Sequence, residues 1–385
     1  MPAVGVESVE LYGRLSVLLC PLTNIIPLIG AAQLSFVNPP VLKLDFTGGA
    51  GVGSLAAIDG VVKNTVLGII NSMLTLPNRY LIKLDPNSSY FDAFQYPLGV
   101  ARITVEDASG FAEEAKGAAK KLFSKITRSA PDTFAKVDVG AEESWSTSVK
   151  NNKVKPSWNE THDFVVSDFE QCIKVGVEDQ DVNGNDELGL GVTTVREILL
   201  AGGRKDLRLV HEGEQTEGRV SISCQFFQFE NSSTSFSNSN HKGDGLLCGL
   251  ATVLIASASG IKGQRDQLTP SVVVTWGSKH RFQTAVKTDA PGTDINNPSW
   301  DFSCRIPVTT DMVSESASAF KFTLMSGEKE LGTVDVPLTE VQNAPDGILQ
   351  STFATGDGAS IKASICIRGI APATMEESTL PVRSK

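Results

Sequence analysis

Residues 177–189 have the sequence VEDQDVNGNDELG, and they decide how the rest of the chain is interpreted. The stretch follows an alternating apolar run, residues 173–177, which is typical of a half-buried strand. It then brings Asp179, Asp181 and Asp186 together around Asn-Gly turn chemistry. Such a loop suits calcium, which takes about six to eight oxygen ligands in flexible geometry. A solvated acidic turn is the alternative that this stretch alone leaves open.

The strands around this loop predict a β-rich domain over residues 97–228. Alternating apolar runs recur at the spacing of an antiparallel sandwich, at residues 101–105, 134–139, 145–149, 164–166, 173–177 and 220–226. Three motifs resemble those of C2 domains and stand in the family's order: residues 130–137 (APDTFAKV), residues 155–160 (KPSWNE) and the acidic loop. The resemblance implies an all-β antiparallel sandwich whose calcium site is built by two loops at one end.

Four carboxylates are implied as calcium ligands by this resemblance: Asp132 in loop one, and Asp179, Asp181 and Asp186 in loop three. The family's other loop-one aspartate has no clear match, and Asp107, Glu113 and Glu114 are the uncertain substitutes. A site with fewer carboxylates is expected to bind calcium weakly and to use carbonyls, water and lipid phosphate as further ligands. An acidic end that no longer binds metal is the alternative.

An insertion at residues 111–129 has the pattern of a basic amphipathic helix. Apolar residues fall on one helical face: Phe111, Ala115, Ala118, Leu122 and Ile126. Basic residues fall largely on the other: Lys116, Lys120, Lys121, Lys125 and Arg128. Such a helix beside the calcium loops is expected to lie in the headgroup region of an anionic phospholipid membrane. An ordinary surface helix packed on the sandwich is the alternative.

A second basic patch precedes Trp158, where C2 domains often bind phosphoinositide headgroups. It consists of Lys150, Lys153 and Lys155. Three lysines in a loop are commonly just solvated, and that alternative stays open.

Residues 1–84 predict strands, a helix and a last strand. The strand-like runs are residues 9–19 and 32–46, the second folded on itself at residues 38–40 as a hairpin. Its alternating apolar residues give one apolar face that forms either a core or a lipid groove: Leu34, Phe36, Leu42, Leu44 and Phe46. The helix carries apolar residues on one face at three- and four-residue steps: Leu55, Ile58, Val62, Val66, Ile69, Met73 and Leu76.

This segment resembles the C-terminal half of the synaptotagmin-like mitochondrial lipid-binding domain. The resemblance is carried by residues 9–15 (VELYGRL), 20–22 (CPL), 44–48 (LDFTG) and above all 68–79 (GIINSMLTLPNR). It implies an α+β tubular module that dimerises and carries glycerolipids in an apolar groove. The family's domain is longer at its N-terminus and is normally preceded by a membrane hairpin.

Residues 246–370 repeat the β domain after a Ser/Asn-rich linker at residues 229–245. Pro-Ser-Trp at 156–158 recurs at 298–300, and Glu-Leu-Gly at 187–189 recurs at 330–332, at offsets of 142 and 143 residues. The second copy has Thr269-Pro270-Ser271 and residues 325–329 (MSGEK) where the acidic motifs would stand. We therefore predict a degenerate C2 domain that binds no calcium. It is expected to pack on the first copy, bind a protein, or bind lipid through Lys279, His280, Arg281 and Lys287. Residues 371–385 predict a disordered tail.

Composition limits the possible functions. Hydrophobic content of 41% and charged content of 20% are those of an ordinary globular protein, and the net charge of -10 argues against wholesale nucleic-acid binding. The six cysteines lack metal-ligand spacing, which favours reduced, buried thiols. No segment approaches the length of an apolar membrane span, and no signal-peptide pattern opens the chain. We expect a cytoplasmic protein that is peripheral on membranes.

Taken together, the motifs resemble extended synaptotagmins, tricalbins and plant synaptotagmins across nearly the whole chain. The resemblance implies a calcium-modulated membrane tether between endoplasmic reticulum and plasma membrane, with glycerolipid transfer and a homodimer. A C2 adaptor without lipid transfer is the first alternative. A lipid-metabolising enzyme is the second, and no nucleophile elbow, metal-binding His pair or complete nucleotide loop supports it. We therefore expect no enzyme.

Overall fold

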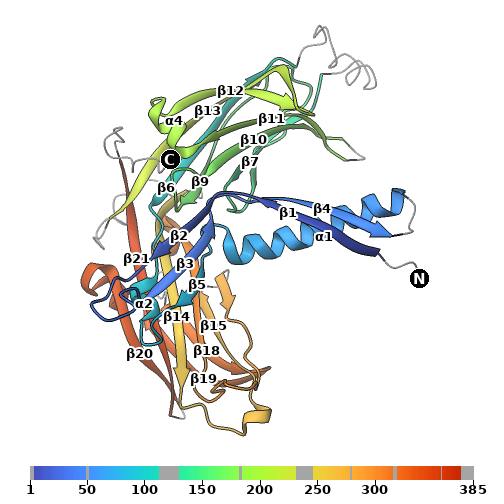
Figure 1. The fold of residues 1–385 in the computed structure, drawn as a ribbon. Helices are drawn as coiled ribbons and strands as arrows, with labels where there is room; N and C mark the ends of the chain where they lie inside the picture. Colours follow the sequence, from blue (N-terminus) through green and yellow to red (C-terminus); the bar gives the residue numbers. More distant parts are fainter. Residues whose placement is uncertain are drawn as a thin grey trace. The chain divides into compact units, whose positions relative to one another are not determined.

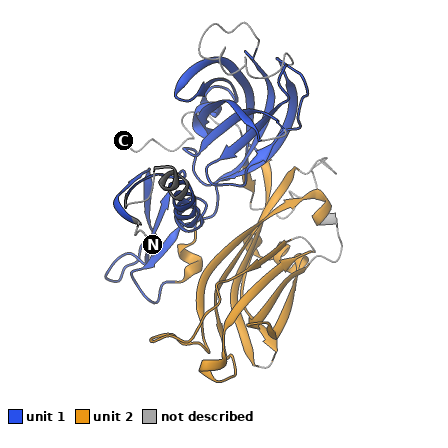
Figure 2. Ribbon diagram, turned by 90° about the vertical axis from the view of Figure 1, so that its right-hand side faces the viewer, with its two compact units in different colours: residues 1–88, 95–227, 372–385 blue, residues 89–94, 228–371 orange. Residues whose placement is uncertain are grey.

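The computed structural model describes residues 4–48, 52–111, 130–181, 184–230, 246–277, 280–314, 319–356 and 358–373. The chain forms two compact units, coloured separately in Figure 2: residues 1–88, 95–227 and 372–385, and residues 89–94 and 228–371. Three predicted features lie largely or wholly outside the described residues: the basic helix, the linker and the C-terminal tail.

The N-terminal segment, residues 4–85, combines two small antiparallel sheets with one long helix (Figure 1). Its elements are β1 (Val4–Tyr12), β2 (Leu15–Leu19), β3 (Ala31–Phe36), β4 (Val41–Gly48), α1 (Val52–Leu74) and β5 (Tyr80–Lys83). Strand β1 pairs with β4, while β3 lies between β2 and β5. Helix α1 packs on β4 and β3.

The predicted hairpin over residues 32–46 is wrong, because β3 and β4 lie in different sheets. Pro39 and Pro40 carry no N–H to donate to a ladder, so the chain does not pair with itself across them. Instead β4 pairs with β1, and β3 pairs with β2. A Cβ added at Gly13, between β1 and β2, would lie 2.9 Å from the Phe36 ring, so this close approach requires glycine.

Helix α1 does not bury the single apolar face that its spacing predicted. Ile69 and Met73 are 54% and 48% exposed. Val62, Val66 and Ile70 are half-buried. Apolar residues lie on all sides of this helix, so its packing against β4 and β3 cannot cover all of them. Among the helices of the described residues, none has both the length and the apolar character needed to cross a bilayer.

The first sandwich, residues 99–230, consists of two antiparallel four-stranded sheets. Its elements are β6 (Gly99–Ser109), β7 (Thr133–Val139), β8 (Trp145–Ser146), β9 (Ser157–Val166), β10 (Cys172–Asp179), β11 (Asp186–Thr194), α4 (Val195–Leu200), β12 (Arg204–His211) and β13 (Glu214–Glu230). The strand orders are β9-β6-β13-β12 and β8-β7-β10-β11, and the two sheets are joined where Leu190 of β11 pairs with Val210 of β12. Phe111, the first residue of the predicted basic helix, is not helical and is 4% exposed within the core between these sheets. It therefore packs in the sandwich, while the remainder of the predicted helix lies outside the described residues.

The second sandwich, residues 247–372, repeats this architecture with the strand orders β17-β14-β21-β20 and β16-β15-β18-β19. Its elements are β14 (Leu247–Ser259), a 3-10 turn (Arg265–Gln267), β15 (Pro270–Trp276), β16 (His280–Gln283), β17 (Ser299–Thr309), α5 (Thr310–Ser314), β18 (Ala319–Ser326), β19 (Lys329–Pro337), α6 (Leu338–Gln342), a 3-10 turn (Pro345–Gly347), β20 (Ile348–Gly356) and β21 (Ala359–Pro372). The short helix α2 (Tyr90–Ala93) belongs to this unit and packs against β14.

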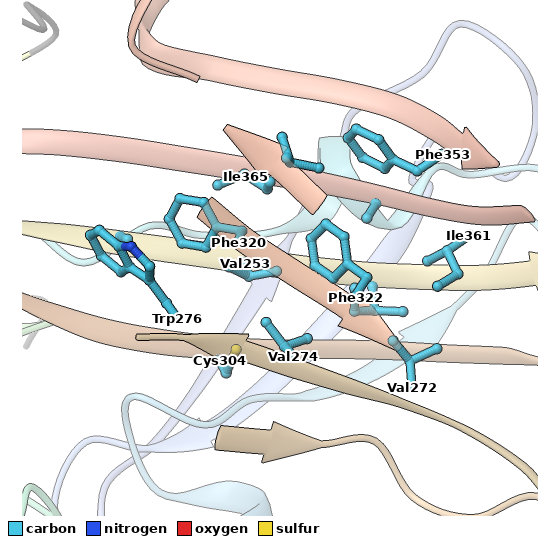
Figure 3. Close-up of a cluster of buried hydrophobic side chains, with 14 of the residues drawn as sticks. Val253, Val272, Val274, Trp276, Cys304, Phe320, Phe322, Phe353, Ile361 and Ile365 are labelled. Atoms are coloured by element: carbon cyan, nitrogen blue, oxygen red, sulfur yellow. The ribbon is translucent and has the colours of Figure 1, made fainter. Parts of the chain in front are cut away.

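Aromatic rings pack among aliphatic side chains in the core of the second sandwich, as Figure 3 shows. The rings of Trp276 and Phe320 are 4.6 Å apart, and those of Phe322 and Phe353 are 5.7 Å apart. Cys304 belongs to the same cluster, and burial raises the pKa of its thiol to about 12. This thiol is therefore protonated at neutral pH and packs as a small apolar side chain.

Matching hydrogen bonds show that the two sandwiches repeat one structural plan. The Trp158 indole donates to the carbonyl of Ser148 at 2.9 Å, and the Trp300 indole donates to that of Ala285 at 2.8 Å. The residues that follow these tryptophans, Asn159 and Asp301, have φ angles of 52° and 49°. The same left-handed position in both copies indicates the same bulge on β9 and β17.

Within the first unit, Asn38 bonds the N-terminal segment to the first sandwich. Its amide donates to the carbonyl of Glu170 at 2.9 Å and accepts from the N–H of Cys172 at 2.7 Å. The Glu170 carboxylate accepts from Arg196 at 2.7 Å and lies 3.8 Å from Arg14. These bonds meet β10 at its first residue, at the opposite end of the strand from Asp179.

Candidate functional site

Strand register brings the predicted calcium ligands to one end of the first sandwich. Asp179 is the last residue of β10 and pairs with Asp186, the first residue of β11. On its other side Asp179 pairs with Thr133, the first residue of β7, so Asp132 lies immediately beyond that strand end. Asp181 follows two residues after Asp179 in the same loop.

Hydrogen bonds from backbone N–H groups hold two of these carboxylates in place. The N–H of Asp132 donates to Asp179 Oδ1 at 2.7 Å, and the N–H of Asn152 donates to Asp132 Oδ1 at 2.6 Å. The N–H of Gln180 donates to the Asp132 carbonyl at 2.9 Å. Three loops, each from a different strand connection, are therefore joined through Asp132.

The electrostatics of this end favour a bound cation. Asp179 is 5% exposed, whereas Asp181 and Asp186 are exposed. Burial raises the pKa of Asp179, and the negative charges of its three aspartate neighbours raise it further. Only the hydrogen bond from the Asp132 N–H opposes this shift. A divalent cation would relieve both the repulsion and the desolvation cost.

The four aspartates offer the ligand atoms that calcium prefers, but the described side chains do not already form a coordination site. Carboxylate oxygens are the ligands that calcium takes, and each carboxylate keeps an oxygen that the hydrogen bonds above leave open. Within the described residues, however, no three Asp, Glu, His or Cys side chains are grouped closely enough to form a ready metal site. Asp107 is exposed on β6 opposite Ser157, and Glu113 and Glu114 lie outside the described residues. Asp132, Asp179, Asp181 and Asp186 would therefore hold calcium only by closing around it.

The three lysines of the predicted basic patch lie in different environments. Lys150 forms an ion pair with Glu160 at 3.4 Å, so its charge is partly neutralised. Lys153 and Lys155 are exposed, and the N–H of Lys153 donates to the carbonyl of Pro131 at 3.0 Å. Two lysines thus lie beside the acidic loops. The four lysines of the predicted helix, Lys116, Lys120, Lys121 and Lys125, lie outside the described residues.

The corresponding end of the second sandwich keeps the framework without the carboxylates. The N–H of Thr269 donates to Ser326 Oγ at 3.0 Å, as the N–H of Asp132 does to Asp179. Lys329 pairs with Ser326 where Asp186 pairs with Asp179. Arg265 forms an ion pair with Asp289 at 2.8 Å and donates to the carbonyl of Thr293 at 2.7 Å. A guanidinium therefore joins loops of this copy, a feature that the sequence analysis missed.

The N-terminal segment has an apolar surface that differs from the predicted one. Residues on one face of the β2-β3-β5 sheet are apolar and largely exposed, and we call them the outer apolar face: Leu15, Val17, Leu19, Ala32, Leu34, Tyr80 and Ile82. Their exposed fractions reach 56% at Val17. On the opposite face Gln33 and Ser35 are 4% and 0% exposed. Ala31 on this opposite face and Phe36 at one end of the outer face are buried as well. The sheet therefore buries a mixed polar and apolar face and leaves most of an apolar face exposed, unlike an ordinary half-buried sheet.

The five predicted groove residues do not share one face. Leu34 and Phe36 belong to β3, while Leu42, Leu44 and Phe46 belong to β4 in the other sheet. Phe36 and Leu42 are 8% and 6% exposed and act as core. Leu34, Leu44 and Phe46 are half-buried. The alternating apolar residues of β2 were the signal that could have found the outer apolar face.

Two family models match the chain. The C2 domain matches residues 102–207 and 249–351, and the synaptotagmin-like mitochondrial-lipid-binding domain matches residues 1–85. The chain belongs to the extended synaptotagmin family. Both models name modules that bind lipid or membranes, and neither is a catalytic domain.

Relatives and solved structures agree with this assignment. The chain is 24% identical to extended synaptotagmin-2 of Homo sapiens over 94% of its length and 40% of the relative's. It is 28% identical to extended synaptotagmin-3 of Xenopus tropicalis over 75% of its length and 31% of the relative's. A solved structure of extended synaptotagmin 2, which holds the SMP domain and two C2 domains, superposes with a TM-score of 0.62 at 20% identity. The match covers 96% of this chain and 78% of that one.

A calcium-bound structure of two C2 domains of extended synaptotagmin 2 also superposes, with a TM-score of 0.57 at 17% identity. It covers 72% of this chain and 99% of that one. The chain spans less than half the length of the curated relatives it matches. The predicted fold, a partial α+β lipid-binding segment followed by two C2 sandwiches, is confirmed.

Proposed function

We propose that the first C2 domain docks this protein on anionic phospholipid membranes in a calcium-modulated way. The observation that carries the proposal is the acidic end of the first sandwich, where Asp179 is buried beside three further aspartates. A calcium ion held there would remain open to lipid phosphate, because Asp181 and Asp186 are exposed. Lys153 and Lys155 lie beside the same loops and add attraction for an anionic surface.

Co-sedimentation with phosphatidylserine vesicles tests this proposal, with calcium or with chelator. The variant is Asp181→Asn/Asp186→Asn. Both side chains are exposed, so their replacement should leave the fold of the domain intact. We expect calcium to increase binding of the wild type, and the double variant to need about tenfold more calcium, because calcium affinity follows the number of charged ligands.

The matched control is Glu143→Gln/Asp206→Asn, which removes the same net charge from exposed positions of the first sandwich away from the acidic end. Binding of this control should follow the wild type. If calcium has no effect on wild-type binding, the metal-dependent part of the proposal is wrong, and membrane contact would depend on basic residues alone.

The outer apolar face supports carriage of glycerolipid by the N-terminal segment. Largely exposed apolar side chains on three adjacent strands offer a surface that acyl chains can contact. Together with membrane docking, lipid carriage leads us to propose that the protein is a lipid-transferring tether at contacts between endoplasmic reticulum and plasma membrane. We propose that it acts there as a homodimer. Lipid extraction from the purified protein followed by mass spectrometry tests it.

A lipid-free result would favour the adaptor alternative, in which the segment only packs against other domains. The matched variant is Val17→Asp/Ile82→Asp, which places charges on two exposed positions of the outer apolar face. We expect it to lose most of the co-purified lipid while keeping calcium-dependent vesicle binding, because the first C2 domain is unchanged. Light scattering of the purified protein checks the dimer.

A further inference from the structure

The loop between β2 and β3 exposes the most apolar surface of any connection that the structure describes. Leu22, Ile25, Ile26 and Leu28 are 78%, 74%, 88% and 54% exposed. Single exposed aliphatic residues are common on protein surfaces, but four within seven positions form a continuous apolar tip. We call residues 22–28 the apolar tip.

Backbone hydrogen bonds order the apolar tip as a turn. The N–H of Thr23 donates to the carbonyl of Leu28 at 2.9 Å, and the N–H of Leu28 donates to that of Ile25 at 2.6 Å. Gly30 donates to the carbonyl of Pro21 at 2.7 Å. The prolines at 21 and 27 carry no N–H at all. These bonds and the two prolines reduce the number of backbone N–H groups that an apolar medium would leave unpaired.

Leu28 is held in a conformation that folding alone does not explain. Its φ is 69°, in the left-handed region that disfavours residues with a side chain. The side chain gains no burial in return, since it is 54% exposed. Strained residues of this kind gather at functional sites. An apolar environment outside the described chain would supply the missing burial.

The composition of the tip favours a lipid bilayer over a protein partner. Residues 15–42 contain no charged side chain, so the large cost of burying a charge does not oppose entry of this stretch into hydrocarbon. The tip, with the sequence LTNIIPL, lacks Trp, Tyr and Arg, the residues that dominate protein interfaces, and four of its seven residues are Leu or Ile. Leu19 and Ala32, which flank the loop, belong to the outer apolar face, so the tip and that face are continuous.

We propose that residues 22–28 insert into the acyl-chain boundary of a phospholipid bilayer and make the outer apolar face continuous with the membrane interior. The inference rests on the proposed function, since it names the part by which the lipid-binding segment reaches a bilayer. It requires neither calcium nor anionic lipid, because the tip and its neighbours in sequence are uncharged. Insertion to the depth of interfacial segments, about 5–10 Å, would bury all four aliphatic side chains.

Depth-dependent quenching tests insertion directly. Ile26→Trp is measured with vesicles of neutral phosphatidylcholine whose acyl chains carry bromine, in the presence of chelator, as a difference spectrum against the parent protein. We expect the added indole to shift its emission to the blue and to be quenched. Val192→Trp, at a strand position that is 52% exposed on the first C2 domain, should show neither change.

Loss of binding gives a second measurement. Ile25→Asn/Ile26→Asn should weaken binding to neutral vesicles by about tenfold or more, which corresponds to about 1.4 kcal/mol. The control Val192→Asn/Leu200→Asn changes two aliphatic residues that are 52% and 47% exposed elsewhere, and it should bind as the wild type does. Both double variants should keep the thermal unfolding midpoint, because the changed side chains are exposed.

Two results would overturn the proposal. An indole at position 26 that is already blue-shifted in buffer and indifferent to vesicles would show that polypeptide covers the tip. Unchanged neutral-vesicle binding of the Ile25→Asn/Ile26→Asn variant would show that the tip does not contact lipid. Calcium-dependent binding to phosphatidylserine vesicles would persist in either case, so failure of the tip is distinguishable from failure of the first C2 domain.

Discussion

The two C2 domains share a scaffold and differ in the chemistry at one end. Both hold a buried threonine hydroxyl against the second strand, with Ala135 N–H donating to Thr147 and Val272 N–H donating to Thr284, each at 2.9 Å. At the loop end, the carboxylate of Asp179 is replaced by the hydroxyl of Ser326, which accepts the equivalent bond. The scaffold therefore depends on an acceptor at this position, and only one copy uses a charged one.

The difference shows that framework and binding chemistry are separable in this fold. A hydroxyl is enough to order the loops, so the aspartates of the first domain exceed what the fold requires. A buried carboxylate that neighbouring carboxylates repel lowers stability, as the raised pKa of Asp179 indicates. Such a cost is typical of sites that bind a ligand rather than of structural positions.

The largest effect is expected from Phe320→Ala in the second domain. Phe320 is fully buried with its ring 4.6 Å from that of Trp276. Its truncation should lower the free energy of unfolding of this domain by about 3–5 kcal/mol, through lost burial and a residual cavity. Chemical denaturation followed by tryptophan fluorescence measures this change. The calcium response of the first domain should persist. A loss of that response would contradict the conclusion that the framework and the binding chemistry are separable.

A matched pair of tryptophan variants sharpens the comparison of the two scaffolds. Trp158 is 6% exposed and Trp300 is half-buried, although both indoles make the same bond. Trp158→Phe should therefore cost about 1–3 kcal/mol of unfolding free energy, since it leaves the Ser148 carbonyl unpaired where water enters poorly. Trp300→Phe should cost less, because water can replace the indole. Equal losses of unfolding free energy in thermal denaturation would show that the exposure of the indole does not determine how much its hydrogen bond stabilises the domain.

The sequence predicted the acidic end well because its information is local. The alternating residues before Asp179 and the turn chemistry after it lie in one short stretch, and strand register then brought Asp132 and Asp186 beside it. The calcium ligands as a working set remain a prediction. The ion pair between Arg265 and Asp289 was missed because its partners belong to different loops, and no local pattern joins them.

The N-terminal segment was predicted less well because its pairing is non-local. The alternation in residues 32–46 is the same whether these residues pair with each other or with β1 and β2, and the sequence alone did not distinguish the two. The same apolar alternation is also expected whether a sheet face packs in a core or contacts lipid. Only the burial of Gln33 and Ser35 on the opposite side separates these cases.

The pH dependence of stability should separate the two domains at equivalent positions. Because the pKa of Asp179 is raised in the folded protein, the folded state holds this proton more tightly than the unfolded chain does. This contribution to stability is complete below the ordinary aspartate pKa of about 4 and is lost as the pH rises through the raised value. In chelator, Asp179→Asn should therefore flatten the fall in thermal midpoint between acid and neutral pH. Ser326→Ala should leave the pH dependence unchanged, and an equal effect of both variants would contradict the assignment.

The smallest effect is expected from Arg265→Gln, which tests whether a guanidinium stands in for a cation in the second domain. The ion pair with Asp289 is exposed, with side chains 52% and 39% accessible, so solvent screens it and its loss should change the unfolding free energy only slightly. The released Asp289 should not create a calcium site, because Ser326 and Lys329 replace the loop-three aspartates. Thermal unfolding of the variant with and without calcium measures both effects. A calcium-dependent rise in its unfolding midpoint above that of the wild type would show that Arg265 alone prevents this domain from binding metal.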